Sequence, residues 1–320
     1  MPYSGPIAVA TLSNFLAALV SWAVTNAGFT DEGTTAAPSG RGTDMYRISK
    51  GGMYWWFMGY PISYGYSAGV IEMRMQTALP TAANYSSNSV GPNEITRCDL
   101  YANHDGPYTA YNFFSDEAGT VVHAVLEVFP NVFNHISFGE VTKYGTWPGG
   151  QYLTTQYYRN TTNLMFSGGT PPFADYINSS SYGSFVHYPK DAFGDYRDYA
   201  EFGTKSNDQW AAGCTFGARE TGTTISHYAS PFGMFWGLGP NGWNQRAALF
   251  PQYVLLWRAT LDRMFLAGHV PGVKFVHMGA IEPKDIVESE WEVFPLTQKA
   301  GDFTVAPISL NSGLAYQRVP

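Results

Sequence analysis

The chain has 320 residues and a formal net charge of −7, and only 13% of its residues are charged, against roughly 25% in ordinary soluble proteins. A hydrophobic fraction of 45% argues against intrinsic disorder, which needs low hydrophobicity and high charge. The acidic balance and the lack of a basic run argue against specific nucleic-acid binding. Aromatic residues reach 16%, and a ring-rich surface with little charge suits contact with other proteins or with carbohydrate.

The first expected element is an amphipathic helix within residues 7–24. Its apolar positions recur at helical spacing: Leu12, Phe15, Leu16, Leu19 and Ala23. The stretch is apolar enough to suggest a signal peptide, but no Lys or Arg precedes it, since the first is Arg41. We therefore expect a helix docked on a sheet, no signal peptide or membrane insertion, and synthesis in the cytoplasm.

A hairpin is expected next, formed by strands at residues 45–49 and 53–57. Gly51 and Gly52 lie between them, and glycine supplies the positive φ that tight hairpin turns need. Residues 70–76 have the composition of another strand, and residues 80–94 that of an exposed loop.

The strongest strand pattern covers residues 121–129, where β-branched and apolar side chains occupy both faces. This composition predicts a central strand. Residues 133–144 follow after a Pro-Asn turn and are its expected antiparallel partner. Residues 145–150 end that strand in a turn rich in glycine.

The second half of the chain has weaker patterns. Residues 159–185 contain many turn formers and are expected to be a long functional loop or a segment ordered by a neighbour. A second helix is predicted over residues 251–266, with Pro251 at its start and Gly268 after its end. The closing strands are expected at residues 270–278, 290–296 and 314–318.

The resulting fold class is α+β, predominantly antiparallel β, with a sandwich or barrel-like core, an N-terminal helix and one C-terminal helix. Three segments are expected along the chain. Residues 1–150 form a helix plus a β-sheet half, residues 151–205 a loop-rich excursion, and residues 206–320 a β-rich half. One continuous domain is the alternative.

Candidate catalytic or metal-binding groups are few. None of the seven histidines has metal-ligand spacing; His123 and His135 lie on neighbouring predicted strands, could meet across the sheet, and are interpreted as core or solvent-face residues. An acidic stretch suits either a calcium site or carboxylate pair, or a solvated face. It comprises Asp191, Asp195, Asp198 and Glu201.

Motifs for a serine nucleophile or a phosphate-binding loop do not occur in the sequence. We therefore expect no enzymatic activity, cofactor or metal. Cys98 and Cys214 have no metal or redox spacing, and both free thiols and one long-range disulfide remain open.

Aromatic side chains are the remaining candidates for a binding surface. Six Tyr and Trp residues lie between residues 54 and 66, and either an aromatic core or an outward-facing interface would use them. The candidate interface residues are Tyr54, Trp55, Trp56, Tyr60, Trp147, Trp236 and Trp243.

Three blocks of sequence resemble a group of tailed-phage virion structural proteins. The first is the helix with a Trp followed by the hairpin, residues 12–57. The second is the His-x-x-Phe-Gly motif at His135 with the turn at 143–150. The third comprises Val-Pro-Gly-Val at 270–273, Trp-x-Val-Phe-Pro-Leu at 291–296 and Gly-Leu-Ala-Tyr-Gln-Arg at 313–318.

The resemblance implies a virion location and a ring-forming homo-oligomer of the neck, collar or head–tail connector, with itself and other virion proteins as partners. The alternative is a baseplate or tail-tip protein that binds a host receptor or surface glycan. A glycan-cleaving tail protein using residues 191–201 is a third possibility. The lack of repeats or of a coiled-coil stem favours the first.

Overall fold

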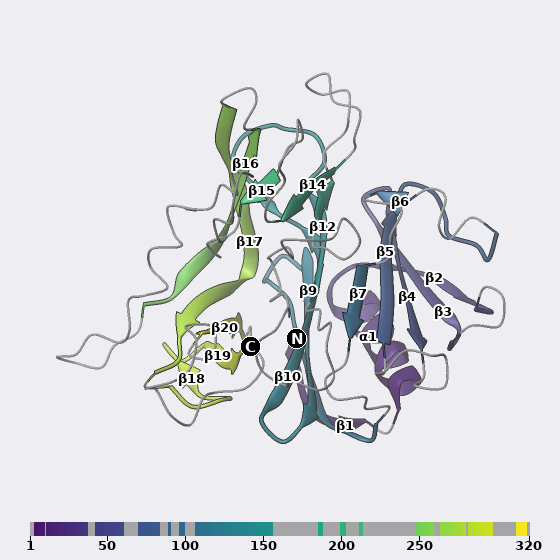
Figure 1. Cartoon of the computed structure of the whole chain (residues 1–320), viewed down its shortest axis with the longest axis horizontal. Coiled ribbons are helices and arrows are strands. Elements are labelled where there is room, and N and C mark those ends of the chain that lie inside the picture. The colour runs from purple at the N-terminus through teal and green to yellow at the C-terminus, as the bar shows by residue number, and fades with distance from the viewer. Residues whose placement is uncertain are drawn as a thin grey trace, which may run out of the picture.

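The protein, described by a computed structural model, consists mainly of antiparallel β-strands, with one α-helix among the described residues. The strands form two hydrogen-bonded sheets, one of 14 strands and one of six (Figure 1). The predicted predominance of antiparallel β-structure with an N-terminal helix is therefore confirmed. The structure describes residues 3–9, 11–37, 42–60, 70–83, 89–90, 96–99, 106–155, 185–187, 199–202, 211–213, 248–258, 263–279, 281–296 and 312–318.

The helix α1 (Leu12–Asn26) forms where the apolar spacing predicted it. Thr11 caps its N-terminus, because the Thr11 hydroxyl oxygen accepts a hydrogen bond from the Asn14 N–H at 3.2 Å. Trp22 of the helix packs on Phe113 of strand β8 (Tyr108–Phe114), with ring centroids 5.7 Å apart. The five residues predicted to share one face are all buried: Leu12, Phe15, Leu16, Leu19 and Ala23.

The smaller sheet contains the hairpin that the Gly-Gly pair predicts. Strands β3 (Met45–Lys50) and β4 (Met53–Tyr60) are antiparallel, and Gly51 and Gly52 have φ angles of 58° and 80°. Positive φ at both central residues defines a type I′ turn, whose twist matches that of the strands. Strand β5 (Val70–Gln76) coincides with its prediction. The other strands of this sheet are β2 (Thr30–Thr35), β6 (Ser89–Val90) and β7 (Thr96–Asp99).

An antiparallel pair lies within the larger sheet, β9 (Val121–Phe129) and β10 (Val132–Glu140), which confirms the predicted pairing. Asn131 between them has φ 60°, a left-handed conformation that asparagine tolerates in turns. The expected partner extended to residue 144. Instead, the chain leaves β10 after Glu140, and β11 (Thr142–Lys143) pairs with β17 (Arg263–His277).

Strand β9 is buried on both faces and separates two hydrophobic cores. Val122 and Leu126 belong to the core around α1, whereas Val121 and Val125 belong to a second core built with the C-terminal strands. The β9–β10 pair thus contributes side chains to one hydrophobic core on each of its two faces. The predicted segments 1–150, 151–205 and 206–320 stay a prediction.

The remaining strands of the larger sheet lie on either side of this pair, and all described neighbours are antiparallel except β14 and β15. The expected strands at 290–296 and 314–318 correspond to β19 and β20, and that at 270–278 to the end of β17. The long excursion predicted at 159–185 lies outside the described residues apart from Phe185. The remaining strands are β1 (Tyr3–Val9), β12 (Gln151–Thr155), β13 (Phe185–His187), β14 (Tyr199–Phe202), β15 (Ala211–Gly213), β16 (Phe250–Arg258), β18 (Ile286–Val287), β19 (Trp291–Pro295) and β20 (Ser312–Gln317).

The helix predicted over residues 251–266 is wrong. This segment forms most of β16 and the start of β17, which pair from Phe250↔Phe275 to Arg258↔Arg263. A short apolar run fits a buried strand as well as a helix, and here hydrogen-bonding strands on both sides of β16 decide for the strand. Gly268, expected beyond the helix, lies inside β17. A Cβ there would be 2.1 Å from the Thr142 carbonyl oxygen, so the pairing of β11 requires glycine.

Candidate functional site

A closed polar cluster lies on the second-core face of β9 and β10. His123 is paired with Ser137 and His135 with Val125, so the two imidazoles share one face as diagonal neighbours. The ring of Tyr316 contacts both, with centroids 5.2 Å from His123 and 5.8 Å from His135. The two histidines, which were predicted to meet across the sheet, are thus bridged by the ring of Tyr316. Five side chains form the cluster, none more than 1% exposed: His123, His135, Ser137, Tyr152 and Tyr316.

The hydrogen bonds around His123 have one consistent direction. The Nε2 atom lies 2.9 Å from the Pro271 carbonyl oxygen, which can only accept, so Nε2 carries the proton. In the neutral ring Nδ1 then accepts, and the Ser137 hydroxyl 2.7 Å away donates to it. The Tyr152 hydroxyl, 2.7 Å from the Ser137 oxygen, is the donor to that serine. Each side-chain donor and acceptor in this series of hydrogen bonds, from Tyr152 through Ser137 and His123 to Pro271, therefore has a partner.

His135 repeats the arrangement with different partners. Its Nε2 donates to the Pro295 carbonyl oxygen at 2.9 Å, and its Nδ1 accepts from the Tyr316 hydroxyl at 2.8 Å. The Tyr316 ring stacks on Phe114 with centroids 5.2 Å apart and an interplanar angle of 16°. The tyrosine is thus held by packing as well as by its hydrogen bond.

Burial determines the protonation of both histidines. Desolvation lowers the pKa of His123 to about 4, although its bond to the Pro271 carbonyl acts in the opposite direction. Desolvation also lowers the pKa of His135 to about 4, and the neighbouring His123 contributes to the decrease. Both rings are therefore neutral near pH 7. Burial raises the pKa of Tyr152 and Tyr316, so their hydroxyls remain donors.

The cluster joins segments that are far apart in the sequence. Pro271 lies in β17, Pro295 ends β19 and Tyr316 lies in β20, so these three strands are all tied to β9 and β10. Gly272 next to Pro271 has φ 70°, and a Cβ there would be 3.3 Å from His123 Nε2. The cluster is closed to substrates, and its geometry suits a structural clamp.

The aromatic turn, residues 143–148, is the main surface feature beside this clamp. The Ala267 carbonyl oxygen accepts from the Tyr144 N–H and from the Trp147 indole N–H, both at 2.8 Å. Tyr144 is 44% exposed and its ring contacts the His269 ring, and Leu266, which precedes Ala267 in the chain, is 40% exposed. The turn therefore presents fixed apolar side chains to solvent.

Charge at the aromatic turn is balanced locally. Lys143 Nζ lies 5.4 Å from the centroid of the Trp147 ring and 3.1 Å from a carboxylate oxygen of Glu140. Such a surface pair contributes little free energy. It leaves the turn without net charge, which suits either a neutral protein surface or a carbohydrate.

The predicted aromatic candidates occupy different environments. Strand β4 of the smaller sheet carries four of them: Tyr54 is half-buried, and the other three, Trp55, Trp56 and Tyr60, are buried. Trp147 is half-buried at the aromatic turn. In this fold Trp147 is thus the candidate that lies beside exposed apolar side chains. Trp236 and Trp243 lie outside the described residues.

Most of the predicted acidic stretch lies outside the described residues, so its arrangement stays a prediction. The residues outside are Asp191, Asp195 and Asp198, whereas Glu201 is on β14. The state of the two cysteines stays open, because Cys98 is on β7 and Cys214 lies outside the described residues.

Sequence reasoning missed most partners of the two histidines, namely Ser137, Tyr152 and Tyr316. These residues lie in strands β10, β12 and β20. No local sequence pattern indicates that their side chains contact the two histidines. His135 and Tyr316 are 181 positions apart in the sequence.

No group of His, Cys, Asp and Glu side chains in the described ranges is arranged to hold a metal ion. Nor does that part of the chain contain a helix long and apolar enough to span a membrane. A scan against protein-family models found no match, and a search of curated proteins found no similar sequence.

Proposed function

We propose that this chain is a non-enzymatic structural subunit of a tailed-phage particle, which forms a ring with copies of itself at the neck, collar or head–tail connection. The virion assignment rests on the sequence blocks that resemble phage structural proteins. Residues from those blocks, including His135, Pro271, Pro295 and Tyr316, form the buried clamp. They are therefore used to hold the fold together.

The observation that carries the assembly proposal is the aromatic turn. Tyr144 and Leu266 are large exposed side chains, and the Tyr144 N–H and the Trp147 indole N–H both bond to the carbonyl of Ala267, the residue after Leu266. Rigid aromatic anchors lose little entropy on association and are typical of the energetic centres of protein interfaces. A chain with 13% charged residues also has few charges to desolvate in such a contact.

Ring formation is tested on the purified chain by sedimentation velocity and electron microscopy across a concentration series. We expect closed rings of uniform size for the wild type and mostly monomers for Tyr144→Ser with Leu266→Ser. Leu79→Ser is the matched control, because it removes an exposed apolar side chain from another region. Rings that survive the double substitution would place the interface elsewhere, and a monomeric wild type at every concentration would refute self-assembly.

Virion location is tested by mass spectrometry of purified tailed-phage particles that carry the gene, followed by immunogold electron microscopy. Label at the head–tail junction supports the neck proposal. Label at the distal tail favours the baseplate alternative. If purified particles lack the protein, the virion proposal is wrong.

A glycan-binding tail-tip protein is the second candidate, and the exposed ring of Tyr144 beside Trp147 favours it. Aromatic rings pack against the apolar faces of sugars, and the neutral turn carries no repelling charge. This candidate predicts saturable binding of host surface polysaccharide that Tyr144→Ala and Trp147→Ala abolish. Leu79→Ser should leave that binding unchanged.

A further inference from the structure

The strap, residues 282–290, covers the edge of the larger sheet at β19. Its strand β18 forms the last position of the described sheet order and pairs Ile286 with Glu292 and Val287 with Trp291. The Lys284 N–H donates to the Val293 carbonyl at 2.7 Å, and the Val293 N–H donates to the Asp285 carbonyl at 2.9 Å. The strap thus occupies backbone groups of β19 that an open edge would leave unpaired.

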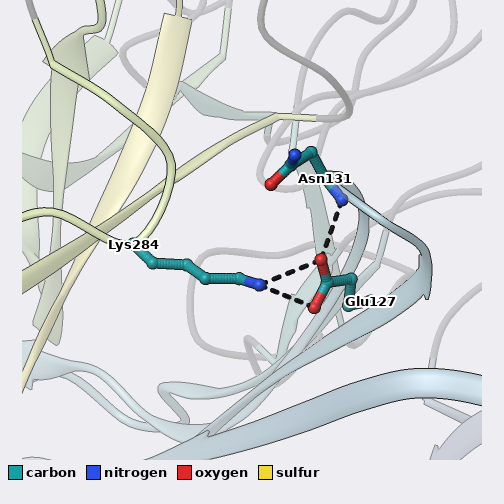
Figure 2. Close-up of polar contacts among 3 residues, drawn as sticks. All are labelled: Glu127, Asn131 and Lys284. Atoms are coloured by element: carbon teal, nitrogen blue, oxygen red, sulfur yellow. Dashed lines mark hydrogen bonds and ion pairs between the residues drawn. The ribbon is translucent and has the colours of Figure 1, made fainter.

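One ion pair connects the strap to the β9–β10 hairpin (Figure 2). Lys284 Nζ lies 2.8 and 3.0 Å from the two carboxylate oxygens of Glu127, and the Asn131 N–H donates to the same carboxylate at 2.8 Å. The side chain of Glu127 is 2% exposed, whereas that of Lys284 is 37% exposed. When the strap lifts, both charges regain water, so this contact holds the strap without making its release prohibitive.

The strap buries few of its side chains. None of residues 282–290 is fully buried, and Ile286 is 48% exposed. Glu288 and Ser289 have φ angles of 51° and 63°, and Lys284 has 71°, values that favour glycine or asparagine. By contrast, Phe294 in β19 and Leu296 just after this strand are buried in the second core. The strap is therefore the least stabilised part of this edge.

We propose that the strap is a releasable cover, latched by the Glu127–Lys284 ion pair, which opens locally and exposes the edge of β19 while the two large cores stay folded. Release breaks the pairing of β18 with β19, the two backbone bonds to Val293, the bond from the Arg318 N–H to the Glu290 carbonyl, and the ion pair. The hydrogen-bonding groups of β19 then become accessible to another strand. This device does not depend on the virion assignment.

Native-state hydrogen exchange with Glu127→Gln tests the latch. The Gln side chain keeps an oxygen for the Asn131 N–H but loses the charge that holds Lys284, so the fold is retained. We expect the Lys284 and Val293 amides to exchange about tenfold faster, while amides in β9 and β10 keep their rates. Glu140→Gln is the matched control, because it removes the partner of Lys143 at the aromatic turn without touching the strap.

A second variant, Ser289→Gly, should make the same local opening of the strap less frequent. Glycine relieves the positive φ, so the two amides should exchange roughly threefold more slowly than in the wild type. Unchanged strap exchange in Glu127→Gln would overturn the latch. Strap amides that exchange only as fast as those of β9 and β10 in the wild type would overturn local opening, since release would then require global unfolding.

Discussion

The buried histidines make the protein sensitive to mild acid. A histidine in the unfolded chain has a pKa near 6.5, and burial lowers the pKa of His123 and of His135 to about 4 in the folded protein. Between these values the unfolded state binds more protons than the folded state. The stability that depends on the two neutral histidines is therefore fully present above the pKa of the unfolded state. It is lost as the pH falls toward the pKa of the folded state.

The magnitude follows from the two pKa values. Lowering the pH from about 7.5 to about 5 costs about 2 kcal/mol of unfolding free energy per histidine, or about 4 kcal/mol for the pair. This is a large fraction of the roughly 5–15 kcal/mol by which domains are stable. The pH range lies above the ordinary pKa of Asp and Glu, so carboxylates contribute little to the change.

Urea unfolding followed by intrinsic fluorescence at several pH values measures this loss. The matched variant is His135→Gln, whose amide can donate to the Pro295 carbonyl and accept from the Tyr316 hydroxyl but does not titrate in this range. Over this pH range the variant should lose about 2 kcal/mol less unfolding free energy than the wild type. If the wild type keeps its stability down to pH about 5, or if the variant has the same pH slope, the assignment of the clamp as an acid-sensitive element is refuted.

Three substitutions test other parts of the fold, each measured as a change in unfolding free energy. Tyr316→Phe should cost about 1–3 kcal/mol, because it leaves the buried Nδ1 of His135 without a donor; a smaller loss would mean that this bond is replaceable. Gly52→Ala should cost about 1 kcal/mol by positive φ alone, since no atom lies within 4 Å of the added Cβ. Thr11→Ala should cost about 1 kcal/mol through the lost helix cap, whereas Thr11→Ser should be nearly neutral.

Local sequence patterns determined the elements whose stability is mainly local. The i, i+3, i+4 spacing from Leu12 to Ala23 described the buried face of α1, because one helix turn returns side chains to the same side. The Gly51-Gly52 pair located the β3–β4 turn, because few other residues accept positive φ at both positions. The apolar run at 121–129 likewise identified a strand buried on both faces.

Tertiary structure decided the remaining features. Residues 251–266 are apolar enough for a helix or a strand, and only hydrogen bonds to β15 and β17 select the strand. The clamp depends on carbonyls and a hydroxyl located 148, 160 and 181 positions from their histidines. Such contacts leave no periodic trace in the sequence, because a histidine's partner is determined by how distant strands stack and not by its neighbours along the chain.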